Sequence, residues 1–451
     1  MPKYDIVVIG AGPAGTSAAI RAAQLGVPEG LKVCLIEQNA LGGTCLNAGC
    51  MPTKFLSEAV NNIRKISKLS SYGLKANLEP FELNAIMAKK NQMVNALRKG
   101  NELKIKSYGI EIISGSARFK NASTIVVDGA EISAGKIIIA AGSVPAEISG
   151  LEINHDNIID STDILNLEVL PESLFVVGGG AIGVEMATIF SSLGVRVTIA
   201  EYADALLPNE DKEIVAEIQK NFARQGVEVI TDCKSIVEVI KGLSPQKVLV
   251  AVGRKFNDNL GLKAIGLEFT PKGFIKTDEA YKTNIENIYA AGDCTGKGML
   301  AYTASNYGVE AVESIFGQAT IIENGVTPYA VFSSPPAASV KTADFDKNEN
   351  VLTGKYPFTA SGKAFIEGER QGFIKVAVDK NTHKLIGCWI IGAHSFEIIH
   401  TASQIIHSGI SVKSLKPSGF FHPSLTEGLL NAITHALGCC TELPNTANTA
   451  K

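Results

Sequence analysis

Two cysteines, Cys45 and Cys50, are separated by four residues in the segment GGTCLNAGCMPTK, residues 42–54. Thiols at this spacing can form a disulfide if the segment is the start of a helix, and a helix N-terminus lowers the pKa of a thiol. On spacing alone, two other interpretations remain open: a pair of inert buried thiols, or part of a zinc site. The zinc site lacks support, because the chain has no CxxC motif or matching His/Cys cluster to supply the remaining ligands.

A glycine motif lies upstream of the cysteine pair, between a predicted strand at 4–9 and a predicted helix at 14–25. Its glycines are Gly10, Gly12 and Gly15. They allow a tight turn and let backbone N–H groups approach a pyrophosphate, while the helix N-terminus adds positive potential. Glu37 ends the next predicted strand, where a carboxylate can hold a ribose hydroxyl. The pattern predicts a dinucleotide-binding βαβ unit.

A second motif of the same form follows a predicted strand at 174–177 and opens a predicted helix at 181–193. Its glycines are Gly178, Gly180 and Gly183, and Glu201 ends the next predicted strand. A carboxylate there accepts bonds from a free ribose 2′-OH and repels a 2′-phosphate, and no arginine occurs at 202–205. The sequence therefore favours NAD over NADP. The plainer alternative for both motifs is a pair of glycine turns in an ordinary α/β protein.

The elements that position these residues must form several packed domains, because the chain has 451 residues, 45% of them hydrophobic and 19% charged. A net charge of −3 argues against nucleic acid or an anionic membrane surface as the main partner. The eight cysteines do not form the framework of a secreted protein. No signal peptide precedes the first strand and no apolar stretch is long enough to cross a bilayer, so we expect a cytoplasmic protein.

Hydrophobic periodicity and turn residues predict the remaining elements. Helices are predicted at 58–69, 85–104, 397–408 and 427–437, short strands within 110–139, and strands at 372–378 and 385–391. A further strand is predicted to end at 250–254. The chain after Cys440 is polar and predicted to be disordered.

The segment 42–54 and the two glycine motifs resemble the class I pyridine nucleotide–disulfide oxidoreductases, and within them the dihydrolipoamide dehydrogenases. The resemblance spans nearly the whole chain. It implies an α/β fold with two Rossmann-like domains, for FAD and NAD, and a C-terminal α+β dimerisation domain. The corresponding segments are 1–143 for FAD and the redox disulfide, 144–254 for NAD, 255–327 for a central FAD-binding part, and 328–451 for dimerisation.

The resemblance also implies roles for residues around the cysteine pair. Cys45 is expected to be the interchange thiol that meets the substrate, and Cys50 the charge-transfer thiol beside the flavin. Lys54 is expected to lie near the flavin, paired with Glu185, which follows the second glycine motif. Without the resemblance, a lysine at a helix start is more often a solvated charge.

Further cofactor-binding positions are implied in the same way. Asp293, at the end of an AAGD segment, is expected to bind the ribitol chain of FAD, although such an aspartate is more commonly a helix cap. Gly142 and Gly253 mark the strand ends where the chain leaves the FAD and NAD domains. Gly43 and Thr44 complete the expected set of cofactor contacts, and no metal site is expected.

Near the C-terminus, the segment HPSLTE at 422–427 resembles the family's HPTxxE segment. There the histidine is the acid–base for thiol chemistry and the glutamate orients its imidazole, which points to His422 and Glu427. Histidine titrates near neutral pH, and a carboxylate partner fixes its tautomer. In the family this histidine reaches the disulfide of the other subunit, so a working site would need a homodimer.

The chain departs from the family pattern at several places. Segment 226–250 is about one hairpin shorter than in the family's NAD domain, so we expect a missing surface hairpin. Phe420 and Tyr302 stand where histidines are common, and the prolines at 335–336 replace Pro-Glu. These changes weaken the substrate assignment and leave the flavin and disulfide chemistry intact.

Cys439 and Cys440 form an adjacent pair near the end of the chain. C-terminal thiols of mercuric reductases and large thioredoxin reductases shuttle electrons or metal ions. The plainer interpretation is two incidental cysteines.

The leading hypothesis is oxidation of dihydrolipoamide to lipoamide with reduction of NAD to NADH, through Cys45, Cys50 and FAD. The dihydrolipoyl group would belong to a 2-oxoacid dehydrogenase complex. Alternatives are a reductase of another acceptor (a glutathione-like disulfide, mercuric ion or thioredoxin) and a non-catalytic flavoprotein. Glu201 argues against the NADPH users, and His422 argues against mercuric reductases, which lack that base.

Overall fold

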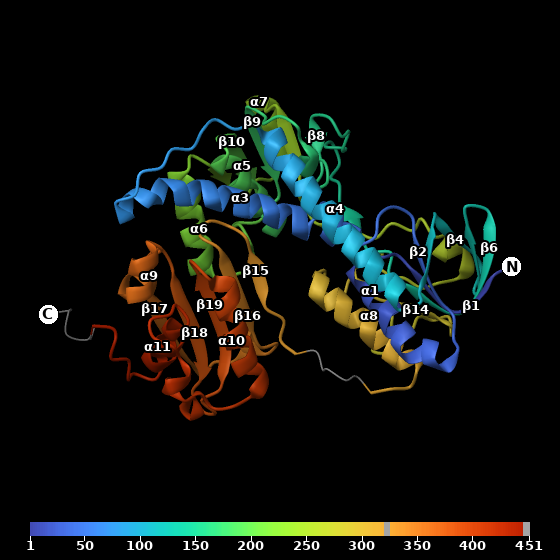
Figure 1. Cartoon of the computed structure of the whole chain (residues 1–451). Coiled ribbons are helices and arrows are strands. Elements are labelled where there is room, and N and C mark those ends of the chain that lie inside the picture. Colours follow the sequence, from blue (N-terminus) through green and yellow to red (C-terminus); the bar gives the residue numbers. More distant parts are fainter. Residues whose placement is uncertain (320–324, 445–451) are drawn as a thin grey trace. The chain divides into compact units, whose positions relative to one another are not determined.

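The computed structural model describes residues 1–319 and 325–444, which form two compact units of three stretches each. The first unit comprises Met1–Leu56, Phe81–Val169 and 252–319, and the second comprises Ser57–Pro80, Leu170–Ala251 and 325–444 (Figure 1). The division into four functional segments stays a prediction, because compact units follow contacts and not cofactor sites. Of the tail predicted to be disordered, residues 445–451 lie outside the described residues.

A seven-stranded sheet forms the centre of the first unit. Its order is β3-β2-β1-β6-β5-β4, with β14 also beside β6. The strands are β1 (Lys3–Ile9), β2 (Val33–Glu37), β3 (Glu111–Ser114), β4 (Ala117–Asn121), β5 (Thr124–Val127), β6 (Ala130–Ile139) and β14 (Ile288–Ala290). Strands β1, β2, β3, β6 and β14 pair in parallel, and β4, β5 and β6 pair antiparallel. The strands at 4–9, 33–36 and within 110–139 were predicted, whereas β14 was not.

Side chains of β1 alternate between two cores, as the period of two in a strand requires. Ile6 and Val8 pack with helices α1 (Pro13–Gly26) and α8 (Ala301–Ile315), whereas Val7 and Ile9 pack into a separate cluster. Helix α1 is rich in alanine, and a Cβ on Gly308 of α8 would lie 2.2 Å from the Ala14 carbonyl oxygen. The two helices therefore approach closely, and they run side by side in Figure 1.

Three further helices, α2 (Gly43–Ala48), α3 (Cys50–Lys68) and α4 (Leu83–Ser107), follow β2 in the chain. The helix predicted to begin after Pro52 and the helical pattern at 58–69 both belong to α3, which begins at Cys50, and the helix predicted at 85–104 corresponds to α4. A two-stranded antiparallel ribbon joins β7 (Val144–Pro145) to β13 (Arg254–Lys255). The strand predicted to end at 250–254 is therefore two strands, because β12 (Lys247–Val250) stops before β13 begins.

The second unit contains a parallel sheet in the order β11-β10-β9-β12. Its strands are β9 (Ser173–Val177), β10 (Arg196–Ala200) and β11 (Glu228–Ile230), together with β12. Helices α5 (Ala181–Ser192) and α6 (Lys212–Arg224) connect the strands, and α7 (Ile236–Leu243) lies between β11 and β12. Residues 226–250 are all described and contain no β-hairpin, in agreement with the expectation from the sequence.

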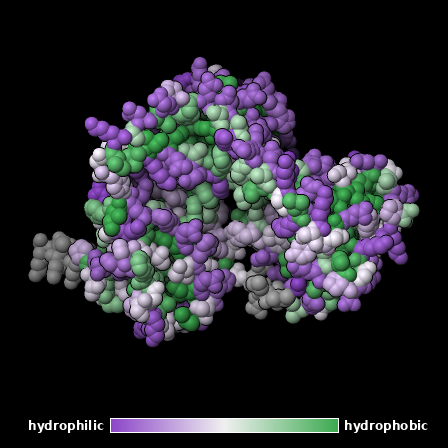
Figure 2. Space-filling model, in the orientation of Figure 1, coloured by the Kyte–Doolittle hydropathy of each residue, from purple (hydrophilic) through white to green (hydrophobic). Residues whose placement is uncertain are grey.

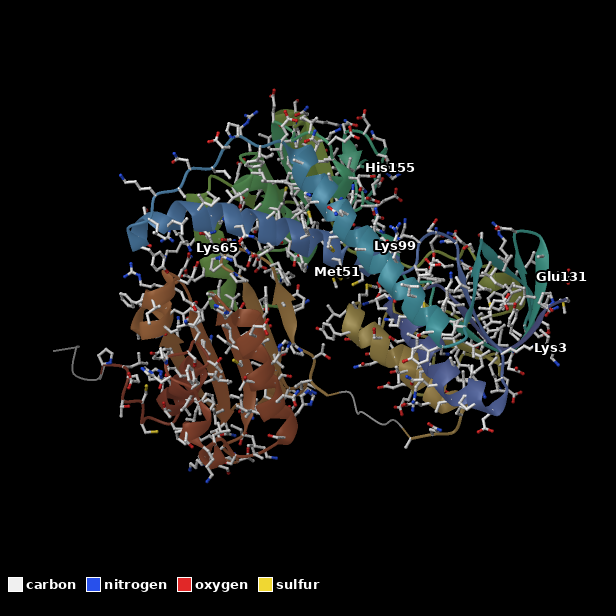
Figure 3. The ribbon with its side chains drawn as sticks, in the orientation of Figure 1. Lys3, Met51, Lys65, Lys99, Glu131 and His155 are labelled. Carbon is white, nitrogen blue, oxygen red and sulfur yellow. The ribbon has the colours of Figure 1, made fainter. Side chains whose placement is uncertain are left out.

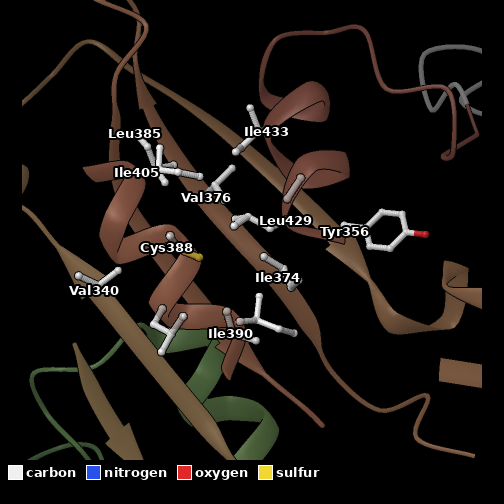
Figure 4. Packing of buried hydrophobic residues seen from close by; sticks show 14 of the residues in the cluster. Val340, Tyr356, Ile374, Val376, Leu385, Cys388, Ile390, Ile405, Leu429 and Ile433 are labelled. Carbon is white, nitrogen blue, oxygen red and sulfur yellow. The ribbon is translucent and has the colours of Figure 1, made fainter. Parts of the chain in front are cut away.

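An antiparallel sheet in the order β15-β16-β19-β18-β17 completes the second unit. Its strands are β15 (Tyr329–Val331), β16 (Ala337–Lys341), β17 (Val351–Pro357), β18 (Phe373–Asp379) and β19 (Leu385–Ile391). Helices α10 (Ser395–Ser408) and α11 (Glu427–Ala436) pack on it, and α9 (Gly362–Glu367) is a short helix beside it. Figure 4 shows the core between this sheet and α10 and α11, where Ile374, Val376 and Leu429 meet. The remaining short strand is β8 (Ile158–Ile159).

The surface of the molecule mixes hydrophilic and hydrophobic residues on the face shown in Figure 2. Within residues 1–319 and 325–444, no helix combines the length and the apolar composition needed to cross a membrane.

Candidate redox site and nucleotide-binding sites

The two cysteines of the first unit lie on consecutive helical segments. Cys45 is inside α2, Gly49 breaks the helix with φ −153° and ψ −108°, and Cys50 is the first residue of α3. Both thiols are partly buried, they are not joined in a disulfide, and they hydrogen-bond each other. The bond with Cys50 raises the pKa of Cys45, burial and the negative charge of Cys50 raise it further, and Lys54 opposes the shift. Cys45 therefore keeps its proton, while Cys50 stands where a helix N-terminus stabilises a thiolate.

The first glycine motif forms a tight loop between β1 and α1. Gly10 has φ +99°, a left-handed conformation that favours glycine. A Cβ on Gly15 would lie 1.7 Å from the Gly10 carbonyl oxygen, so only glycine allows the helix to start so close to the strand. Gly43, at φ +56°, would place a Cβ 2.6 Å from the Cα of Gly12. The loop that carries the cysteines therefore packs directly on the glycine loop.

Glu37 closes this first loop from the end of β2. Its Oε2 accepts a hydrogen bond from the Ala11 N–H at 2.7 Å, and its Oε1 accepts one from the Asn39 N–H at 2.9 Å. Each carboxylate oxygen can accept more than one bond, so Glu37 keeps capacity for a ribose hydroxyl. Thr44 is exposed beside the loop. The residues present thus fit an adenine dinucleotide.

Asp293 belongs to a small polar network that sequence reasoning did not find. Ser143 Oγ donates to Asp293 Oδ2 at 2.7 Å, and Arg254 donates from Nε to Ser143 Oγ at 2.6 Å and from Nη2 to the Ser143 carbonyl oxygen at 2.5 Å. Burial lowers the pKa of Arg254, and the nearby Asp293 carboxylate acts against that shift. Gly142 and Gly253 flank this network with φ +70° and φ +113°. The network holds the carboxylate of Asp293 in one orientation.

The second glycine motif repeats the first loop in the second unit. Gly178 has φ +105°, and a Cβ on Gly183 would lie 1.9 Å from the Gly178 carbonyl oxygen. A Cβ on Gly180 would have no neighbour within 4 Å, so the space above this loop is open to a phosphate group. Glu201 accepts hydrogen bonds from the N–H groups of Gly179, at 2.6 Å, and Ala203, at 2.8 Å.

A lysine lies beside Glu201 that the sequence did not single out. The Lys234 ammonium lies 3.7 Å from the centroid of the Tyr202 ring and forms an ion pair with Asp232 at 2.9 Å. Its pKa is raised, first by the hydrogen bond to Asp232. Lys234 is 33 positions from Glu201, so no local pattern links the two residues. The Asp232 carboxylate balances its charge.

Lys54 and Glu185, expected to pair, belong to different units and are described separately. Lys54 is partly buried on α3 in the first unit. Glu185 is buried on α5, and its Oε1 accepts a hydrogen bond from the Phe332 N–H at 3.1 Å. Their pairing stays a prediction.

His422 and Glu427 form a hydrogen-bonded pair in the second unit. His422 Nδ1 lies 2.9 Å from Glu427 Oε2, and Glu427 Oε1 accepts from the Ser424 N–H at 3.2 Å. Glu427 is the first residue of α11, and only 20% of its side chain is exposed. The His422 side chain is 81% exposed, next to the exposed Phe421. Glu427 is thus fixed by the backbone, and the imidazole leaves its Nε2 side to solvent.

Other positions that depart from the expected pattern are described one by one. Tyr302 is half-exposed on α8, and burial raises its pKa. The backbone at Pro336 accepts a hydrogen bond from the Gly392 N–H. Cys439 is exposed, Cys440 is partly buried, and the Cys439 N–H bonds the Thr434 carbonyl at the end of α11.

Two family models match the chain over most of its length. Residues 4–308 match the pyridine nucleotide-disulphide oxidoreductases, and residues 327–433 match the dimerisation domain of the same family. The second match supports a homodimer.

Curated relatives of similar length share about a third of their residues with the chain. A dihydrolipoyl dehydrogenase from Thermus scotoductus is 36% identical over 454 residues, covering 96% of this chain and 97% of that protein. The dihydrolipoyl dehydrogenase from Chlamydia pneumoniae is 34% identical over 459 residues, covering 96% of this chain and 98% of that protein.

Solved structures share the fold. The HOCl-induced flavoprotein disulfide reductase RclA from Escherichia coli, in its Cu(II) complex, matches with a TM-score of 0.83 and 27% identity over 96% of this chain and 99% of that chain. LpdA from Mycobacterium tuberculosis matches with a TM-score of 0.84 at 24% identity, over 96% of this chain and 99% of that chain. The fold is that of the α/β flavoprotein disulfide reductases, with FAD and nucleotide domains and a C-terminal dimerisation domain.

Glycine loops, cysteine pair, family models and full-length relatives thus lead to one conclusion: this chain belongs to the pyridine nucleotide-disulphide oxidoreductases, enzymes that use FAD and a pyridine nucleotide.

Proposed function

We propose that the chain oxidises dihydrolipoyl groups to lipoyl groups and reduces NAD, with Cys45 and Cys50 as the redox-active pair. The observation that carries the proposal is the His422–Glu427 pair, in which a carboxylate fixes an imidazole whose Nε2 is open to solvent. A dithiol substrate needs such a base, because only its thiolate attacks a disulfide. The names of the relatives at 34% and 36% identity support the same substrate class.

Cofactor binding in this proposal falls to the two glycine loops. Gly10, Gly12, Gly15 and Glu37 hold the adenine and phosphate part of FAD, together with Gly43, Thr44 and Gly142, and Asp293 binds its ribitol chain. Lys54, with Glu185 as its partner, lies towards the flavin. When bound, FAD supplies the two-electron chemistry that links the dithiol to the nicotinamide.

The thiol steps follow from the arrangement of the two cysteines. His422 takes a proton from one substrate thiol, and the resulting thiolate attacks Cys45 Sγ, which breaks the Cys45–Cys50 bond and leaves Cys50 as thiolate. The second substrate thiol then attacks the mixed disulfide, which releases the lipoyl disulfide and leaves Cys45 as a thiol. The raised pKa of Cys45 and the position of Cys50 at a helix N-terminus support this division of roles.

A homodimer completes the proposed site. His422 and Phe421 are exposed in the single chain, although one would act as a base and the other is a large apolar side chain. We propose that this segment faces Cys45 and Cys50 of the partner subunit, as the family resemblance implies.

Glu201 supports NAD as the nicotinamide cofactor. Its carboxylate is fixed by two backbone N–H groups and stands where an adenosine ribose would lie, so it favours a free 2′-OH and repels a 2′-phosphate. Lys234 contacts Tyr202, the residue after Glu201, and forms an ion pair with Asp232 that balances its charge.

The test is the steady-state rate of NADH formation from dihydrolipoamide and NAD by the purified yellow protein, with NADP run in parallel. Turnover with NAD alone agrees with the full proposal. Absence of turnover with bound flavin that NADH still reduces contradicts the lipoyl substrate and leaves the family assignment standing.

A second candidate is a reductase of another disulfide or of a metal ion. It is favoured by the likeness to RclA and by the replacement of two expected histidines, at Phe420 and Tyr302. Oxidation of NADH that depends on a disulfide or metal ion other than lipoamide would support it. Cys439 and Cys440 would then be the first residues to replace.

A further inference from the structure

Asn47 lies between the two cysteines, and its side chain ties the start of α2 to the preceding loop. Its Nδ2 lies 3.3, 3.1 and 2.9 Å from the carbonyl oxygens of Ala40, Leu41 and Gly43. These carbonyls belong to the turn that enters α2, the helix that carries Cys45. The Asn47 amide therefore connects helix α2 to the turn that precedes it.

The other end of the same amide is held by Arg98 of α4. Arg98 donates to Asn47 Oδ1 from Nε at 3.1 Å and from Nη2 at 2.8 Å, across 51 positions of the chain. A guanidinium only donates and the three carbonyls only accept, so the amide has one possible orientation. Figure 3 labels Lys99, the residue after Arg98, and Met51, the residue after Cys50.

We propose that Arg98 is a positioning residue for the redox pair: through Asn47 it holds α2 so that Cys45 stays beside Cys50 when the disulfide is open. The inference rests on the proposed redox role of these cysteines. Two restrained thiols lose less chain entropy when they close than two mobile thiols do. Arg98 and Asn47 therefore stabilise the disulfide relative to the dithiol.

The position of Arg98 suits this role, because every contact involved lies inside the first unit. A charged donor strengthens both hydrogen bonds to Asn47 relative to bonds from a neutral group. Lys99, one residue further along α4, is exposed and carries the same charge. Replacing Lys99 is therefore a control: it removes one positive charge from α4 and leaves the hydrogen bonds to the Asn47 amide in place.

The experiment measures the thiol–disulfide equilibrium of Cys45 and Cys50 in the FAD-loaded protein. The protein is equilibrated without oxygen in mixtures of reduced and oxidised dithiothreitol, and the free thiols are alkylated in acid. Mass spectrometry of the peptide that contains Cys45 and Cys50 then gives the fractions of dithiol and disulfide. We expect Arg98→Met to shift the equilibrium about tenfold towards the dithiol, which equals a potential about 30 mV higher. Lys99→Met should have the same equilibrium as the wild type. Arg98→Lys should lie between the wild type and Arg98→Met, because lysine keeps the charge and loses the two-pronged guanidinium donor.

A double-mutant cycle tests whether Arg98 acts through Asn47. Asn47→Ala should shift the equilibrium at least as far as Arg98→Met, and the double variant should match Asn47→Ala within about twofold. Additive shifts would overturn the proposal, because Arg98 would then act by another route.

A lower melting temperature with an unchanged thiol–disulfide equilibrium would also overturn it, leaving Arg98 a structural contact only. If Arg98→Met does not fold, Arg98→Lys and Asn47→Ala carry the same measurement. Failure of the wild type to form any Cys45–Cys50 disulfide would contradict the proposed function itself, and the inference with it. The unmutated chain reveals that outcome before any variant is made.

Discussion

The glycine loops of the two units have the same backbone geometry and differ in what lies above them. Gly10 and Gly178 have φ +99° and φ +105°. A Cβ on the third glycine would meet the first glycine's carbonyl oxygen at 1.7 Å in one loop and 1.9 Å in the other. In the first unit, Gly43 of the cysteine loop lies against Gly12, whereas nothing lies within 4 Å above Gly180 in the second.

We propose that this difference lets the same backbone geometry bind two kinds of ligand. A loop that is covered by another segment of the same chain suits a cofactor that stays bound through many turnovers. An uncovered loop suits a nucleotide that must enter and leave in each cycle. The first unit adds the Arg254–Ser143–Asp293 network, and no corresponding network accompanies the second loop in the described residues.

The largest effects are expected from placing a side chain at the third glycine of each loop. Gly15→Val places side-chain atoms against the Gly10 backbone, so we expect loss of bound flavin and about 3 kcal/mol or more of folding free energy. Gly183→Val should strain the second unit to a similar degree and keep the flavin. Flavin absorbance per chain and thermal melting measure both effects.

Gly100→Ala is the matched control, because its Cβ meets no neighbour within 4 Å in α4. It should be neutral or slightly stabilising. Loss of flavin from Gly183→Val as well would mean that the two loops do not serve separate ligands.

The Arg254–Ser143–Asp293 network of the first unit is expected to contribute to FAD binding. Arg254→Met removes the charged donor to Ser143, whose hydroxyl donates to Asp293, so we expect FAD to bind about tenfold to thirtyfold more weakly. Arg254→Lys should recover part of the loss. Fluorescence titration of the flavin-free protein gives the dissociation constants, and unchanged affinity in Arg254→Met would remove the network from cofactor binding.

Glu201 tests the choice of nucleotide in the second unit. Glu201→Gln removes the charge and keeps an acceptor for one backbone N–H, so the NAD/NADP ratio of kcat/KM should fall about tenfold. Lys234→Met is the comparison variant. It should change the ratio less than about twofold, because Asp232 already balances that charge. A larger effect at Lys234 than at Glu201 would reverse the assignment.

The smallest effect is expected where the loop is most open. Gly180 has φ −73°, which any residue adopts, so Gly180→Ala should leave the melting temperature unchanged. The added methyl group occupies space for a phosphate, and we expect KM for NADH to rise about fivefold. A changed melting temperature with unchanged KM would show that the space above Gly180 is not used for binding.

The features that could be predicted from the sequence are those whose chemistry depends on close neighbours. The glycine motifs, Glu37 and Glu201 lie at fixed spacings within single βαβ units, so a local pattern locates them. The Cys45–Cys50 segment and its helix start are local in the same sense. The strands at 4–9, 174–177, 372–378 and 385–391 could be predicted because alternating or continuous apolar runs are typical of strands. Strands β14 to β17 were not predicted.

What could not be predicted depends on contacts between distant segments. Arg98 contacts Asn47 across 51 positions of the sequence, and Ser143 contacts Asp293 across 150. Neither pair therefore forms a short sequence motif that could be recognised. The break between β12 and β13 was missed because residues 248–252 form one apolar run that is followed by Gly-Arg. The two strands differ in their partners, since Arg254 and Lys255 of β13 pair with β7.

The contact between Gly12 and Gly43 has a consequence for changing this enzyme by design. A Cβ on Gly43 would lie 2.6 Å from the Gly12 Cα, so a side chain added to the cysteine loop at Gly43 would enter the first glycine loop. A designer who wants a new electron acceptor therefore has little freedom at 42–43. In the second loop, Gly180 is the position with more freedom, because a Cβ added there would meet no neighbour within 4 Å.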